Sequence, residues 1–191
     1  MMSQTHSQLQ AILRFVKRSL RESQAAPDDV FTALLPLLGE ILQCDRCFLY
    51  LRNPDNQLGK VPFYWRRNLN IPEILDADWK LEPKSLDQDP LFTAALQAKP
   101  SVYVEDVETA DPQIVNRAFE RENFGHRALI HAHLRQDGRL WGILQPCIFG
   151  HPRIWSASDR AVMTEVEQAI TPLAIAYVTT NLNLSRLTQI N

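Results

Sequence analysis

Long apolar segments are missing from this sequence: no run approaches the roughly 20 residues that a membrane-spanning helix requires. Glycine is scarce, with 6 among 191 residues, and there is no Gly-rich phosphate loop, kinase ATP-binding motif or nucleophile elbow. The formal net charge is only −2, which argues against nucleic-acid and anionic-membrane partners. These absences predict a protein that is not an enzyme and that binds neither nucleic acid nor a membrane.

Cysteine is also scarce. Three cysteines, an odd number, argue against a disulfide framework and fit a reducing compartment. The opening residues MMSQTHSQLQ lack the basic-then-apolar order of a secretory signal, so we expect a cytoplasmic protein. The hydrophobic content of 45% is ordinary for a globular domain with a real core.

Helical periodicity is clear near the start of the chain. Apolar residues recur at helical spacing from Leu9 and predict a first helix that ends near Glu22. A break follows, and Pro27 then opens a second helix, because proline is favoured in a first turn. Pro36 lies inside this second pattern and should kink it.

The middle of the chain is strand-like. Residues 126–135 and 139–149 are predicted to form a hairpin, because Gln136-Asp137-Gly138 between them is turn chemistry. The other predicted segments are strands at 47–52, 61–66 and 101–107, helices at 91–98 and 111–123, and a long loop with short helical pieces at 68–89.

A last helix is predicted to begin at Ser156, which forms a capping-box pattern with Asp159. Pro172 predicts a kink in this helix. Its apolar positions alternate spacings of three and four, as in a coiled-coil seam, which favours pairing with a second copy of the chain over packing on its own domain alone. The seam residues are Met163, Val166, Ile170, Leu173, Tyr177, Thr180, Leu184 and Leu187.

The element order predicts an α+β fold with a central, mostly antiparallel sheet and helices gathered on one face. We divide the chain into an N-terminal helix at 1–26, a domain at 27–178 and a C-terminal signalling or dimerisation helix at 179–191.

Several short motifs, in order and at matching spacing, resemble the GAF domain of phytochromes and cyanobacteriochromes over about residues 30–180. The signature strand of that family is similar to LWGIL at 140–144 followed by PRIW at 152–155. Asp45-Arg46 resembles the residues before its first core strand, and DPLF at 89–92 resembles its Asp-x-Cys-Phe stretch. The resemblance implies a GAF fold with a pocket for a linear tetrapyrrole (bilin) between the sheet and a helix-and-loop cap.

The departures from that family concern the attachment of the bilin. The resemblance places Asn116 where the family has its attachment cysteine, Leu91 at the optional second cysteine, and Cys147 at a histidine that packs on the bilin. We therefore expect no covalent bilin of the phytochrome type; a bilin held without a bond, or through Cys147, stays open. The pocket residues that the resemblance implies are Asp89, Phe92, Asn116, Trp141, Cys147 and Trp155.

Two further sets of residues are candidates for chemistry. Cys44 and Cys47 have the spacing of paired thiolate ligands, and with Cys147 they predict an iron–sulfur cluster or a thiol switch, against the alternative of inert buried cysteines. His131 and His133 share one face of a strand; a solvated or half-buried pair is favoured over a metal site.

The hypothesis from sequence is a sensory GAF domain, dimeric through its terminal helices, that relays a redox or small-ligand signal to an output such as a histidine kinase or a response regulator. The alternatives are a photoreceptor domain with an unusual or noncovalent bilin linkage, and a ligand-free dimerisation scaffold.

Overall fold

The computed structural model describes residues 7, 9–11, 13–14 and 27–188, with side chains to Asn181 except that of Asp87. A six-stranded antiparallel sheet in the order β3-β2-β1-β6-β5-β4 forms its centre. The strands are β1 (Arg46–Asn53), β2 (Leu58–Arg66), β3 (Asp76–Leu81), β4 (Val102–Val104), β5 (Ala128–Gln136) and β6 (Arg139–Ile148). The helices are α2 (Pro27–Ile41), η1 (Lys84–Gln88, a 3-10 helix), α3 (Pro90–Leu96), α4 (Arg117–Asn123) and α5 (Ala157–Thr188).

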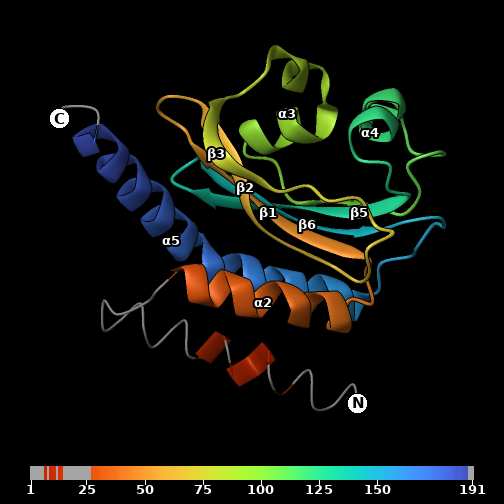
Figure 1. Ribbon diagram of the computed structural model, residues 1–191. Coiled ribbons are helices and arrows are strands. Elements are labelled where there is room, and N and C mark those ends of the chain that lie inside the picture. The colour runs from red at the N-terminus through yellow and green to blue at the C-terminus, as the bar shows by residue number, and fades with distance from the viewer. Residues whose placement is uncertain (1–6, 8, 12, 15–26, 189–191) are drawn as a thin grey trace.

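The sheet separates two helical layers. The long helices α2 and α5 pack on one face, whereas α3 and α4, with their connecting loops, cover the other (Figure 1). We call the second layer the cap. Strand alternation divides the side chains of β1 between the layers: Cys47 and Leu49 join the core beneath α2 and α5, and Phe48 and Tyr50 face the cap.

Local signals in the sequence set two of the chain reversals. The predicted β5–β6 hairpin is confirmed, and Asp137 and Gly138 both have positive φ, as a two-residue turn of this kind requires. The predicted capping box also forms: the Ser156 amide donates to Asp159 Oδ2 at 2.8 Å, and the Asp159 amide donates to Ser156 Oγ at 3.1 Å.

The predicted α+β fold with an antiparallel sheet is confirmed, with corrections. The helices lie on both faces of the sheet, not on one. The residues of β3 were expected to be a loop. Every second one is charged and none is buried, so this edge strand has few of the apolar residues by which a strand is predicted. The strand predicted at 101–107 and the helix predicted at 111–123 are shorter than expected, since turns formed around Asp106 and Asp111 occupy the residues between β4 and α4. Both α2 and α5 continue through their internal prolines, and the kinks expected at Pro36 and Pro172 stay predictions.

The predicted helical seam packs largely within the chain itself. Met163, Val166, Ile170, Leu173 and Tyr177 are all buried in the core between α2, α5 and the sheet. Thr180 is exposed, and the side chains of Leu184 and Leu187 lie outside the described part. α5 is one helix across the domain boundary predicted at 178/179. Of the first predicted helix, Leu9 and Leu13 are helical and buried, and residues 15–22 lie outside the described residues.

Within the described residues, no helix is long and apolar enough to cross a membrane.

Candidate functional site

A cavity of about 290 Å³ lies between the sheet and the cap. Its walls are largely aromatic. β1 contributes Phe48 and Tyr50, α3 contributes Phe92, and Phe124 lines the cavity from the C-terminal end of α4. The Phe48 and Phe124 rings stack with their centroids 6.2 Å apart, and Tyr50 meets Phe92 edge-on at 6.2 Å. The cavity therefore offers flat apolar walls to a ligand, with a volume near the lower end of the range typical of ligand pockets.

Asp89 is a buried carboxyl group on the wall of this cavity. Its Oδ1 accepts a hydrogen bond from the Leu91 amide at 2.9 Å and so caps α3, which begins with Pro90. Burial and, to a smaller extent, repulsion from Glu120 raise the pKa of Asp89 to about 7. No Lys or Arg side chain is among the residues that line the cavity. The Asp89 charge therefore has no cationic partner on the cavity wall.

Glu120 and His126 form a buried ion pair beside the cavity. His126 Nε2 lies 2.6 Å from Glu120 Oε2, and their side chains are 0% and 2% exposed. Burial is the largest single influence on the pKa of His126 and lowers it. Cys147 and Glu120 act in the opposite direction, and together they outweigh burial and raise the pKa to about 9. His126 is thus an imidazolium at neutral pH, in contact with the Glu120 side chain. Stacking of His126 on Phe124, with centroids 5.4 Å apart, fixes the ring.

Two more polar side chains face the cavity from the sheet. Gln145 on β6 is 4% exposed, and among the described residues its amide group has no hydrogen-bond partner. His131 on β5 is also 4% exposed, and its Nδ1 lies 2.9 Å from Nε2 of His133. The prediction that His131 and His133 are solvated or half-buried is wrong: both are buried, because the cap covers this face of β5.

The pocket residues predicted from sequence separate into those at the cavity and those elsewhere. Asp89 and Phe92 line it. Asn116 instead caps α4, where its Oδ1 accepts from the Phe119 amide at 3.2 Å, and it borders a different, open hollow. Trp155 belongs to the core under the sheet and donates from Nε1 to the Val104 carbonyl at 3.0 Å. Trp141 is half-buried under the Arg139 guanidinium and does not line the cavity.

The three cysteines are buried and do not form a metal site. Cys44 and Cys47 belong to the core under the sheet. Cys147 lies two residues after Gln145 on β6 and therefore shares its face, toward the cap. Among the described residues no three His, Cys, Asp or Glu side chains are grouped to hold a metal ion. Burial, followed by the other cysteines, raises the pKa of the Cys44 and Cys47 thiols well above its usual value, so both stay protonated. The structure therefore gives no support to the predicted iron–sulfur cluster.

Sequence reasoning missed Glu120, His126 and Gln145. Gln145 could have been found from strand alternation, since Ile143 and Gln145 share the face of β6 toward the cap. The Glu120–His126 contact had no such signal, because it depends on how the chain turns at the end of α4, where Gly125 has a φ of +69°.

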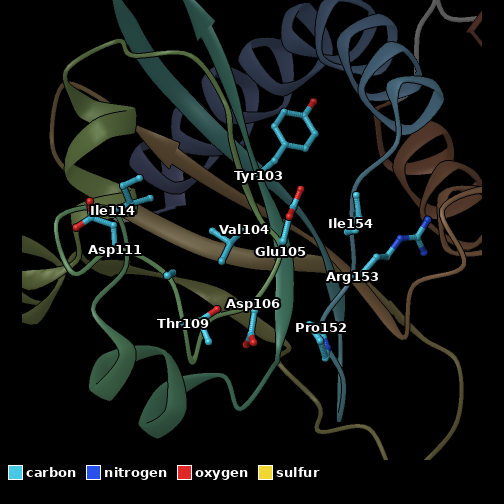
Figure 2. Close-up of a pocket in the computed structure, with 11 residues that line it drawn as sticks. Tyr103, Val104, Glu105, Asp106, Thr109, Asp111, Ile114, Pro152, Arg153 and Ile154 are labelled. Atoms are coloured by element: carbon cyan, nitrogen blue, oxygen red, sulfur yellow. The ribbon is translucent and has the colours of Figure 1, made fainter.

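A second hollow is larger, at about 740 Å³, but open to solvent. It lies between the loop after β4 and the segment before α5 (Figure 2). Two of its charged groups already have partners: Asp106 pairs with Arg127, and Arg153 points away from the hollow toward the helices, where it pairs with Asp159. The smaller cavity, with aromatic walls and several buried polar side chains, is the better candidate for a binding site.

The sheet, the two helical layers and the capped cavity define an α+β domain with an internal site. Residues 26–170 match the family model of the GAF domain, and the chain belongs to that family. Solved structures agree with this assignment. The chain is 19% identical to the phycoerythrobilin-bound GAF domain from a cyanobacterial phytochrome, with a TM-score of 0.68 over 88% of this chain and 94% of that one.

Two other solved GAF domains show the breadth of the fold. A GAF domain of Synechocystis sp. PCC6803 in its photoproduct state is 25% identical, with a TM-score of 0.60 over 85% of this chain and 99% of that one. The GAF domain of an Acinetobacter phosphoenolpyruvate-protein phosphotransferase is 15% identical, with a TM-score of 0.61 over 92% of this chain and 98% of that one. Comparison of the sequence with curated proteins gives no match.

Proposed function

We propose that this chain is a non-catalytic sensory domain that reports a small organic ligand bound between the sheet and the cap. One observation carries the proposal: an aromatic-walled cavity is faced by two buried polar side chains, Asp89, whose carboxyl has no Lys or Arg on the cavity wall, and Gln145, whose side-chain amide makes no hydrogen bond to another described residue. Burial destabilises the charged form of Asp89, and the Gln145 amide gives up contact with bulk water without gaining a hydrogen bond inside the described residues, so both arrangements cost stability. A ligand that pairs with them recovers this cost, which explains why the fold retains them.

A route from this site to the opposite helical layer supports the sensory part of the proposal. The His133 amide donates to Ser101 Oγ at 2.9 Å, and Ser101 in turn hydrogen-bonds Glu167 on α5. We propose that ligand binding shifts α5 through such contacts and through the sheet. Dimerisation through the terminal helices, and an output that is a histidine kinase or a response regulator, complete this proposal. A thiol switch is not part of it, because the Cys44 and Cys47 thiols are buried and stay protonated.

Filling the cavity is expected to remove ligand binding. Indole or 2-aminobenzimidazole at a concentration well above its dissociation constant should raise the melting temperature of the wild type by about 2–4 °C, since a ligand of the folded state adds stability by mass action. The variant Ile143→Phe, which extends a cavity wall, should show no such rise. The matched control is Ile154→Phe, in the open hollow, which should respond like the wild type. Equal responses of the two variants would contradict the proposal.

A bilin is a second candidate ligand, because two of the similar structures are described as phycoerythrobilin-bound and phycocyanobilin-bound GAF domains. If the cavity opens enough to take one, the bilin should be held without a bond, since Asn116 cannot form a thioether and Cys147 does not line the cavity. Phycocyanobilin mixed with the protein should co-elute with it in gel filtration and separate from it after denaturation. Pigment that stays on the denatured chain would show a covalent link and contradict this prediction.

A further inference from the structure

We infer that the ligand of this cavity presents an N–H or O–H group to Nε2 of His131, which the fold holds as a hydrogen-bond acceptor. The inference rests on the proposed function and narrows the class of ligand. It makes His131 a residue that determines specificity, and His133 a residue that positions it.

A backbone carbonyl at the edge of the sheet fixes the proton of His133. His133 Nδ1 lies 2.9 Å from the carbonyl oxygen of Lys99, and a carbonyl can only accept a hydrogen bond. The proton of neutral His133 is therefore on Nδ1, and its Nε2 carries a lone pair. His131 Nδ1 lies 2.9 Å from that Nε2, so His131 must donate to it. Neutral His131 then has its only proton on Nδ1, and its Nε2 is an acceptor.

Both rings are held in the neutral form. Burial, the largest cause, lowers the pKa of His131 well below its usual value, and the neighbouring His133 lowers it further. Burial also lowers the pKa of His133. The two rings meet at 83°, with centroids 5.0 Å apart, and both side chains are buried, so the packing fixes the ring orientations and with them the hydrogen bonds that select the tautomer.

The His131 ring lines the cavity, and Nε2 has no partner among the described residues. The other polar groups on the wall are consistent with the same ligand. Asp89 and Glu120 offer carboxyl oxygens, and Gln145 can both donate and accept. No guanidinium or ammonium group lines the cavity to receive an anion. The complementary ligand is a flat heterocycle with several N–H or O–H groups, either neutral or cationic, and not a carboxylate or a phosphate.

Two isosteric probes test the ligand class. 2-Aminobenzimidazole carries N–H groups along one edge, and 2-methylbenzoxazole has the same shape without a donor. The wild type should bind 2-aminobenzimidazole at least about tenfold more tightly in calorimetric titrations, because a buried acceptor left unpaired by the second probe costs affinity. Equal affinity, or tighter binding of the probe without donors, would overturn the inference while leaving a ligand-binding cavity in place.

The variant His133→Leu separates His131 from the carboxyl groups as the source of this preference. His133 does not line the cavity, but without it His131 can move its proton to Nε2 and become a donor. The preference for 2-aminobenzimidazole should therefore fall several-fold in His133→Leu. An unchanged preference would assign selectivity to the carboxyl groups alone and overturn the role of His131.

A measurement without any ligand decides the tautomer directly, and it does not depend on the folding of a variant. In long-range ¹H–¹⁵N spectra of the wild type, His131 should show a protonated Nδ1 and an unprotonated Nε2. A proton on Nε2 would overturn the inference whether or not any probe binds. Failure of both probes to bind, with the expected tautomer present, would instead count against the proposed function and the ligand class that depends on it.

Discussion

Asp89→Asn is expected to make the protein more stable at pH 8 and, at the same time, to weaken the binding of donor-bearing ligands. Asparagine caps a helix as well as aspartate does, so the hydrogen bond from the Leu91 amide survives. The variant removes the cost of a buried carboxylate that has no Lys or Arg beside it on the cavity wall. A pKa raised from 3.8 to about 7 corresponds to at most about 4 kcal/mol of stability. Water that enters the cavity reduces this cost. We therefore expect a gain of about 2 kcal/mol in the free energy of unfolding.

The pH dependence of this gain has a definite sign. The pKa of Asp89 is raised from 3.8 to about 7, so the folded protein binds the proton more tightly than the unfolded chain does. The contribution of Asp89 to stability therefore falls as pH rises from about 4 to 7 and changes no further above 7. The difference between Asp89→Asn and the wild type should be near zero at pH 4 and largest above pH 7.

Urea unfolding followed by circular dichroism at pH 4, 6 and 8 measures this difference. Asp111→Asn is the matched control, because Asp111 Oδ1 accepts from the Gln113 amide at 2.9 Å in the same local geometry but the residue is exposed. The control should change stability little at any of these pH values. A loss of stability in Asp89→Asn at pH 8 would show that the carboxylate is a structural group and not one retained for binding.

Glu120→Leu is expected to cost about 3–5 kcal/mol of stability at neutral pH, because it leaves the buried imidazolium of His126 without its carboxylate. The double variant Glu120→Leu/His126→Phe should recover most of this loss, since replacing both members of a buried pair by apolar groups is often close to neutral. Glu122→Leu on the exposed side of α4 is the control and should cost less than about 0.5 kcal/mol.

The pH dependence of this cost follows from His126. Its pKa is raised from 6.5 to about 9, so the pair contributes fully below pH 6.5 and its contribution is lost as the pH rises through 9. The cost of Glu120→Leu should therefore be largest at pH 6 and smaller at pH 10. Chemical denaturation at these two pH values checks the prediction, and a cost that does not change with pH would mean that His126 is neutral in the folded protein.

Strong local signals made much of the fold predictable. The hairpin between β5 and β6 has long apolar strands around Asp137-Gly138, and the capping box at Ser156 marks the start of α5. β3 has neither signal, since its position at the edge of the sheet depends on pairing with β2 and not on its own residues. The spacing along α5 predicts a seam but not its partner, because a buried helix face has the same period whether it packs on a sheet or on another helix; the seam residues from Met163 to Tyr177 pack within this chain.

The site was predictable only in part. Asp89 and Phe92 follow from the resemblance to the phytochrome-type GAF domain, because their motif holds a fixed place before α3. The same reasoning placed Asn116 and Trp155 at the pocket, but one caps α4 outside the cavity and the other packs under the sheet. The Glu120–His126 pair and the orientation of His131 depend on tertiary contacts that no spacing in the sequence encodes.

We propose that the cavity between the sheet and the cap is the binding site of this GAF domain. An NMR titration of ¹⁵N-labelled protein with 2-aminobenzimidazole tests it most directly. We predict the largest shifts at the side-chain amide of Gln145 and at the backbone amides of Leu91 and Phe92, with smaller shifts in α5 around Glu167. Shifts concentrated at Tyr103 and Ile154, in the open hollow, or no saturable shifts at all, would contradict it.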